Sequence, residues 1–233
     1  MFTHTTTSLT VRVSDSAGDV EALLLRPDDA NWLLVFAHGA GAGMHHPFME
    51  HLAGQLAGCS VATLRYHFPY MQHRRKRPDP PAVLTATVRA AVAAASETAP
   101  GLPLLAGGKS LGGRMTSLTV ADERSAPGPG IASVRGLVFF GFPLHPAGRP
   151  GTQRAEHLAR VRIPMLFVQG TRDALADLAL LRPLCDTLVP LSTLHVVEGG
   201  DHSFHMLKRF GKTDADVVAE LARTAASWAE TLG

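Results

Sequence analysis

The sequence predicts an α/β fold in which a mostly parallel central sheet carries helices on both faces. Short apolar runs rich in Val, Leu and Phe recur along the chain, Gly- or Pro-containing turns follow them, and helix-like stretches fill the gaps. The runs are almost continuously hydrophobic, as expected of strands that are covered on both faces. At 233 residues the chain can bury a large core, and we expect a single domain over residues 1–233.

The predicted strands begin with an antiparallel hairpin. The stretches LTVRVSD and VEALLLRP flank a turn signal at residues 17–19 and are expected to pair with each other. Six buried strands are then predicted, at residues 32–37, 60–65, 102–107, 134–140, 164–170 and 193–198. Such a hairpin is a common entry into an open α/β sheet.

Two helices have clear start signals. Asp79 is a possible cap in front of two prolines that need no donor in the first turn, and an Ala-rich helix continues to Pro100. Thr213 and Asp216 form a capping-box pattern before the last helix. The Gly/Pro-rich stretches at 125–130 and 146–152 are interpreted as loops within the domain.

The composition excludes several classes of protein. A net charge of +2 is too small to indicate binding to nucleic acid or to an anionic membrane surface. Cys59 and Cys185 have no neighbouring cysteines that would indicate a disulfide framework or a metal knuckle. The first residues lack the pattern of a secretion signal, and no apolar run is long enough to span a bilayer. We therefore expect a cytoplasmic protein with no membrane or nucleic-acid partner.

A G-x-S-x-G pentapeptide occupies residues 108–112, directly after one predicted strand and at the start of a helix. In that setting a tight turn places the serine in a strained conformation and exposes its side chain, so Ser110 is a candidate nucleophile. The alternatives are a Gly-rich loop with a capping serine and a phosphate cradle. The segment lacks the G-K-[ST] ending of a phosphate-binding loop.

A serine nucleophile needs a base, and His202 is the best-placed histidine. It follows the last predicted strand and the turn Gly199-Gly200, on a loop before the final helix. His195 lies inside that strand and His205 begins the next helical stretch, so both are less well placed.

The base in turn needs an orienting acid. The segment after strand 134–140 contains no carboxylate, whereas Asp173 follows directly after strand 164–170. Asp177 lies about one helical turn later and is expected to face away, and Asp201 is too close in sequence to His202 to lie behind its ring. The alternative role for Asp173 is that of a helix N-cap.

The loop after strand 32–37 is rich in glycine and predicts an oxyanion-binding pocket. One donor is expected from the N–H of Leu111, next to the serine, and another from the N–H of Ala40. Gly39 and Gly41 let this backbone approach a substrate. We expect His38 to brace the loop through hydrogen bonds.

A metal site was the sharper alternative for the histidines of this region. The residues considered are His38, His45, His46 and His51. Because no H-E-x-x-H or comparable spacing with a carboxylate occurs, we expect no metal and no cofactor.

With AHGAGAGMHHPFM, GGKSLGGR, GTRDAL and GGDHSF in this order, the chain resembles the α/β-hydrolase superfamily over nearly its whole length. More narrowly it is similar to the small dienelactone hydrolase-like branch, whose domain also occurs in a testis-expressed protein and in a scaffold subunit of a histone acetyltransferase complex. The segment RYHFPYMQHRRKRPDPP also resembles that branch.

The resemblance implies an α/β-hydrolase fold with a minimal cap or none, and a triad of Ser110, Asp173 and His202. Lys109 and the second glycine, Gly113, depart from the elbows of many esterases. With no cap visible, access is expected to depend on the loops at 65–80 and 141–152.

We therefore expect a serine hydrolase that cleaves an ester, thioester or related acyl bond of a small molecule, as a monomer or homodimer. Arg65, Tyr66 and His67 are expected near the substrate. The basic run at 73–77 is interpreted either as a solvated face or as an attractor of an anionic substrate. The rival function is a non-catalytic interaction module with the same fold. Acyl transfer and haloperoxidase-like use of the site are not separated from hydrolysis by the sequence.

Overall fold

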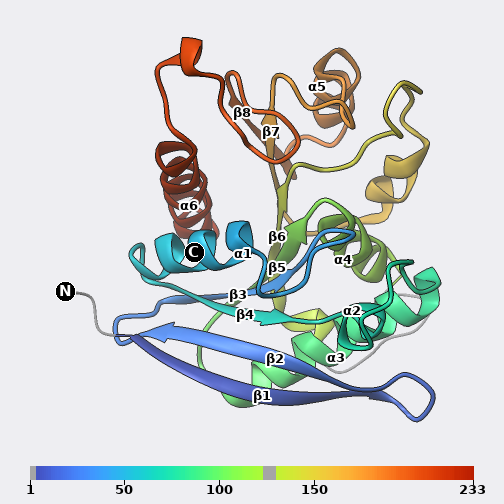
Figure 1. The fold of residues 1–233 in the computed structure, drawn as a ribbon, viewed down its shortest axis with the longest axis vertical. Coiled ribbons are helices and arrows are strands. Elements are labelled where there is room, and N and C mark those ends of the chain that lie inside the picture. The colour runs from blue at the N-terminus through green and yellow to red at the C-terminus, as the bar shows by residue number, and fades with distance from the viewer. Residues whose placement is uncertain (1–3, 123–129) are drawn as a thin grey trace.

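A computed structural model describes residues 4–122 and 130–233, and the predicted loop at 125–130 falls almost wholly outside this part of the chain. Eight strands form one sheet in the order β1-β2-β4-β3-β5-β6-β7-β8 (Figure 1). Their bounds are β1 His4–Ser14, β2 Gly18–Pro27, β3 Trp32–Ala37, β4 Val61–Tyr66, β5 Leu104–Lys109, β6 Val134–Phe140, β7 Met165–Gly170 and β8 Ser192–Val197.

The sheet is mostly parallel, as predicted. β1 pairs with β2 and β2 with β4 in antiparallel fashion, whereas all remaining pairs are parallel. The predicted hairpin is confirmed, although β1 begins five residues before the predicted stretch, and each of the six predicted buried strands is found within two residues of its expected range. Among these six strands β8 is the exception to two-sided burial, because it is the last strand of the sheet and most of its side chains are only partly covered.

Helices cover both faces of the sheet (Figure 1). Their bounds are α1 Pro47–Ala57, α2 Pro69–Gln72, α3 Pro81–Thr98, α4 Leu111–Ala121, α5 Leu178–Thr187 and α6 Asp214–Glu230. Successive residues of a strand point to opposite faces, and β3 shows the result. Leu33 and Val35 pack in the core shared with α3, α4 and α5, whereas Leu34 and Phe36 pack in the core shared with α1 and α6.

One helix start agrees with its prediction and one does not. Thr213 and Asp216 form the capping box of α6 in both directions. Asp79 does not cap α3, because that helix begins at Pro81 and its cap position falls on Pro80. The Asp79 carboxylate instead lies 2.7 Å from a guanidinium nitrogen of Arg75, within the exposed basic run.

The carboxyl edge of the sheet carries no helical cap among the described residues. Between β6 and β7 the chain forms only a 3-10 helix, η2 Gln153–Arg160, which packs against α4. In the same part of the chain no helix is long and apolar enough to cross a membrane.

Candidate active site

Ser110 is the single residue between the end of β5 and the start of α4. Its backbone has φ 48° and ψ −115°, a left-handed conformation that costs a non-glycine residue free energy. The neighbouring backbone holds it there, because its N–H donates to the carbonyl of Phe140 at 3.2 Å and its own carbonyl accepts from Arg114 N–H at 3.1 Å. The turn therefore projects the serine side chain beyond the sheet edge.

The glycines of the pentapeptide are explained by the close approach of β3. A Cβ atom on Gly112 would lie 2.5 Å from the carbonyl oxygen of Ala37, and one on Gly108 would overlap the same oxygen. A Cβ on Gly113 would lie 2.9 Å from the Gly108 carbonyl oxygen. Side chains at these positions would push the turn away from the sheet, so glycine is required for packing.

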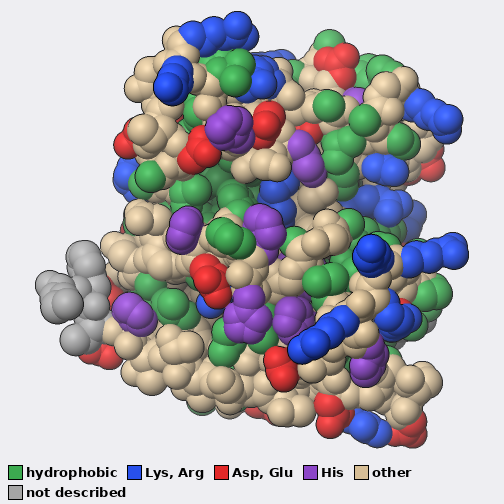
Figure 2. Space-filling view, in the orientation of Figure 1, with side chains coloured by type: hydrophobic (Ala, Val, Ile, Leu, Met, Phe, Trp, Pro, Cys, Tyr) green, Lys and Arg blue, Asp and Glu red, His purple; other side chains and the backbone are tan. Residues whose placement is uncertain are grey.

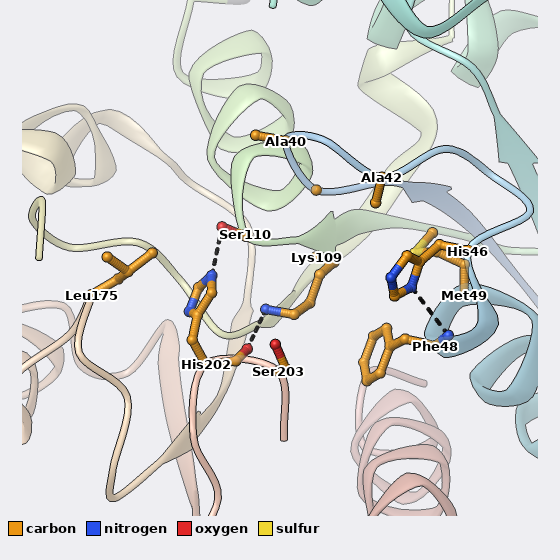
Figure 3. A pocket seen from close by; sticks show the side chains of 11 residues that line it. Ala40, Ala42, His46, Phe48, Met49, Lys109, Ser110, Leu175, His202 and Ser203 are labelled. Atoms are coloured by element: carbon orange, nitrogen blue, oxygen red, sulfur yellow. Dashed lines mark hydrogen bonds between the residues drawn. The ribbon is translucent and has the colours of Figure 1, made fainter. Parts of the chain in front are cut away.

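Three segments that are far apart in sequence bring Ser110, His202 and Asp173 together. His202 Nε2 lies 2.9 Å from Ser110 Oγ (Figure 3), and His202 Nδ1 lies 2.7 Å from Asp173 Oδ2. The serine follows β5, the aspartate follows β7 and the histidine follows β8. The carboxyl ends of parallel strands meet at one edge of the sheet, which is why these loops converge.

The Asp173 side chain is fully buried and receives three hydrogen bonds. Besides the His202 ring, Oδ2 accepts from Gln169 Nε2 at 2.5 Å and Oδ1 accepts from Leu175 N–H at 2.8 Å. Donors on both oxygens fix the plane of the carboxylate behind the imidazole.

The rival acids and bases have other partners. Asp177 caps α5 by accepting from Ala179 N–H, and Asp201 accepts from two N–H groups of its own loop. His195 lies 2.9 Å from Glu220, and His205 lies 2.9 Å from Asp214. Of these acid–histidine pairs, Asp173 and His202 form the one whose histidine also contacts the hydroxyl of Ser110.

A second serine–histidine pair lies under η2. His157 Nε2 is 2.7 Å from Ser117 Oγ, and the Ser117 hydroxyl donates to the Arg114 carbonyl of its own helix at 2.9 Å. Burial, with Arg114 and Arg160 nearby, lowers the pKa of His157 to about 4. Ser117 is buried in the middle of α4, and its hydroxyl proton is already donated to the Arg114 carbonyl oxygen. The pair therefore attaches η2 to α4 and does not present a nucleophile.

Ser110 and His202 open onto a cavity of about 310 Å³, which suits a small-molecule ligand. Figure 3 shows the side chains around it, which come from the loop after β3, the start of α1, the elbow and the loops after β7 and β8. The lining residues are Gly39, Ala40, Ala42, His46, Phe48, Met49, Lys109, Ser110, Leu175, His202 and Ser203.

Among the predicted oxyanion and glycine positions, Gly39 and Ala40 line this cavity. Leu111 is the first residue of α4, where N–H groups have no intrahelical partner, so its N–H is free of the helix ladder. Gly41 has φ +73° and open space around it, and it lies at the turn of the loop instead of in the cavity wall.

His38 braces the Gly-rich loop, as predicted. Its ring is fully buried, with Nδ1 2.8 Å from the Gly39 carbonyl oxygen and Nε2 accepting from Phe68 N–H at 3.1 Å. Burial lowers the pKa of His38 to about 4, which keeps the ring neutral. These contacts fix the proton on Nδ1. Because both ring nitrogens have protein partners, neither is available to the four-histidine metal site that was the alternative from the sequence.

The structure does not place Arg65, Tyr66 or His67 at the cavity. Arg65 is buried and donates to the Met44 carbonyl at 2.9 Å, and Tyr66 is fully buried, so neither offers a surface to a substrate. The His67 ring packs against Gly43 on another side of the loop, and burial lowers its pKa. A strand end alone could not reveal these directions, because alternate residues point to opposite faces.

The sequence reasoning missed most of the apolar wall, which comes from Phe48, Met49 and Leu175. Phe48 and Met49 lie in the first turn of α1, directly after the Gly-rich loop that follows β3, and Leu175 lies two residues after Asp173. Their proximity in sequence to predicted site residues was the available signal. The loops at 65–80 and 141–152, which were expected to control access, contribute no lining residue.

The sequence predicts no role for Lys109, which differs from the elbows of many esterases, yet its side chain lies in the cavity wall. Its Nζ donates to the His202 carbonyl oxygen at 2.5 Å (Figure 3) and lies 5.5 Å from the centre of the Phe204 ring. Burial lowers the pKa of Lys109 to about 8, although the carboxylates of Asp173 and Asp201 act in the opposite direction.

Comparisons with known proteins agree with this architecture. The family described as "Alpha/beta hydrolase domain" matches residues 30–230. The fold is similar to that of a dienelactone hydrolase from Anabaena variabilis, with a TM-score of 0.73 and 19% identity over 97% of this chain and 96% of that chain. It is also similar to a lidless α/β serine hydrolase from Xanthomonas campestris, with a TM-score of 0.69 and 18% identity over 98% and 97% of the two chains. An esterase from Pyrobaculum calidifontis has a TM-score of 0.70 and 17% identity over 97% of this chain and 86% of that chain. The chain therefore belongs to the α/β hydrolase family.

Proposed function

We propose that the protein is a serine hydrolase that cleaves an ester, thioester or related acyl bond of a small molecule through Ser110, His202 and Asp173. The observation that carries this proposal is the unbroken series of hydrogen bonds from Ser110 Oγ through the His202 ring to Asp173, at the wall of a cavity.

In the first half of the reaction, Ser110 Oγ attacks the substrate carbonyl carbon while His202 Nε2 takes the hydroxyl proton. Asp173 keeps the other ring proton on Nδ1, so that Nε2 is unprotonated before attack, and it stabilises the imidazolium afterwards. The C–O or C–S bond to the leaving group then breaks, and His202 returns the proton to that group. The acyl group remains as an ester on Ser110.

In the second half, water attacks the acyl-enzyme with His202 again as the base. The released products are the acid and the free Ser110 hydroxyl. In both halves the carbonyl oxygen becomes negative, and the N–H groups of Leu111 and Ala40 are the proposed donors to it. A donor of this kind contributes about 3 kcal/mol of transition-state stabilisation in serine hydrolases where it has been removed.

The cavity supports a small acyl group with a mainly apolar body. Phe48, Met49 and Leu175 form an apolar wall, and His46 and Lys109 supply the polar groups near it. No step of this reaction requires a cofactor.

A fluorophosphonate probe tests the proposal, because it reacts covalently with an activated serine. We expect wild type and Ser117→Ala to be labelled and Ser110→Ala to remain unlabelled; Ser117→Ala is the matched control because Ser117 also contacts a histidine. Hydrolysis of p-nitrophenyl acetate should follow the same pattern. Absence of labelling in folded wild type would overturn the proposal and favour a non-catalytic interaction module.

A further inference from the structure

A cluster of possible metal ligands lies outside the cavity, on the other side of the oxyanion loop. Glu21 belongs to β2, His45 to the loop between β3 and α1, and His67 follows the end of β4. One ligand atom from each residue lies within 4.8 Å of the others, and among the described residues this is the only such group of three His, Cys, Asp or Glu side chains. None of the three lines the cavity of Ser110.

The spacing is close to that of a bound ion. A tetrahedral ion with bonds of about 2.0–2.1 Å to nitrogen and oxygen holds its ligand atoms about 3.4 Å apart. Because the ligand atoms lie within 4.8 Å of one another, the cluster must contract by at most about 1.4 Å. Glu21 and His45 are exposed, whereas His67 is half-buried with its ring held against Gly43. The half-buried ring therefore provides a fixed point for the two exposed ligands.

Outer contacts orient both histidines. His45 Nδ1 lies 3.4 Å from Glu50 Oε1, which leaves Nε2 available to an ion. A carboxylate behind the imidazole is the usual outer partner of a metal-ligating histidine. Met44 N–H donates to His67 Nδ1 at 3.4 Å, a long hydrogen bond that an ion on either ring nitrogen would displace. Binding thus acts directly on the loop that contains Met44.

Solvent can complete the coordination. A hollow of about 390 Å³ beside the cluster is lined by Glu21 and His45 together with Ser8, Thr10 and neighbouring residues. Histidines also gather on the face of the molecule shown in Figure 2. Two imidazoles and one carboxylate, with an open position for water, form a donor set that suits zinc and similar divalent ions.

We propose that Glu21, His45 and His67 bind a divalent transition-metal ion of the zinc type and thereby fasten the oxyanion loop to β2 and to the end of β4. This differs from the sequence-based expectation of no metal, which considered histidines close together in the chain and missed ligands that the sheet brings together. The ion is structural or regulatory in this proposal, because its ligands lie outside the cavity and the acyl chemistry does not use it.

Titration of tag-free, metal-free protein with Co²⁺ tests the proposal, since bound Co²⁺ has a visible spectrum that reports its coordination. We expect one equivalent to bind to wild type, with affinity reduced about tenfold or more in Glu21→Gln, His45→Ala and His67→Ala. His51→Ala, an exposed histidine on α1, is the matched control and should bind as wild type does. Zn²⁺ should displace Co²⁺.

A second measurement separates loss of binding from loss of folding. Zn²⁺ should raise the midpoint of thermal unfolding of wild type and of His51→Ala but not of Glu21→Gln, the mildest change at an exposed position. Co²⁺ affinity that is equal in wild type and all three ligand variants would overturn the proposal. So would the absence of any spectral change with excess Co²⁺. Neither outcome depends on esterase activity, so the result is independent of the proposed reaction.

Discussion

Lys109 Nζ donates a hydrogen bond of 2.5 Å to the carbonyl oxygen of His202. The lysine directly precedes the proposed nucleophile, and the histidine is the proposed base, so this bond joins the two loops whose alignment the reaction requires. Space around the ammonium group is limited, because a Cβ on Gly141 would lie 3.0 Å from Nζ. Lys109 therefore occupies a fitted position, and we assign it the role of holding the histidine loop.

Lys109→Met should lower kcat and leave KM for a small neutral ester nearly unchanged. Methionine keeps the length and the contact with Phe204 but removes the donor, and a hydrogen bond from a charged group contributes about 1.5–3 kcal/mol, equivalent to roughly 10- to 100-fold in rate. Steady-state kinetics with p-nitrophenyl acetate measure the change. Lys212→Met, at an exposed lysine paired with Glu220, is the control. Unchanged kcat in Lys109→Met would contradict the assigned role.

Asp173→Asn should reduce kcat by about three to four orders of magnitude. An amide cannot stabilise the imidazolium, and an NH₂ group at the Oδ2 position would face the donors of Gln169 and His202. The same substitution at Asp177 is the matched control, because asparagine also caps a helix well and α5 should remain intact. Equal activity of the two variants would show that Asp173 does not orient the base.

The sequence was most informative where local geometry restricts the choice of residue. The turn at Ser110 requires glycine at positions 108 and 112, because a side chain at either position would collide with the Ala37 carbonyl oxygen. The alternation of strands and helices then determines which loops share the edge of the sheet with it. This is why the sequence could predict that Asp173 and His202, on the loops after two of the strands, lie near Ser110.

Side-chain direction and long-range contacts were not accessible in the same way. Tyr66 ends a strand at the correct edge, yet it points into the core and is fully buried. His67 is the next residue and meets Glu21, which is 46 positions away, through the antiparallel pairing of β2 with β4. Such pairings depend on the register of the sheet, which the composition of a strand does not specify.

Leu175→Trp should shift the acyl preference toward shorter chains. The Leu175 side chain lines the cavity, whereas its backbone N–H holds Asp173, so the substitution narrows the cavity without removing that hydrogen bond. A buried methylene contributes about 0.8 kcal/mol, so excluding several should lower kcat/KM for p-nitrophenyl hexanoate relative to the acetate by about tenfold or more. The ratio of the kcat/KM values for the two esters does not depend on the fraction of enzyme that is folded. An unchanged ratio would place the acyl group elsewhere.

Acidification should destabilise the fold through its buried neutral histidines. The pKa of His157 is lowered to about 4, below the ordinary value near 6.5 that applies in the unfolded chain. As the pH falls below 6.5, the unfolded chain therefore binds a proton before the folded chain does. The stabilisation is present above pH 6.5 and is lost progressively down to about pH 4. For this histidine the loss at pH 5 amounts to about 2 kcal/mol.

Urea unfolding of His157→Gln at pH 7 and pH 5 measures this contribution. The glutamine does not titrate, and Ser117 retains its hydrogen bond to the Arg114 carbonyl, so the packing of α4 should survive. The free energy of unfolding should fall between pH 7 and pH 5 by about 2 kcal/mol less in this variant than in wild type. His51→Gln, at an exposed position on α1, should lose as much stability as wild type. If His157→Gln and wild type lost the same amount, His157 would already carry a proton in the folded protein at pH 5, and its contact with Ser117 would have to be that of an imidazolium.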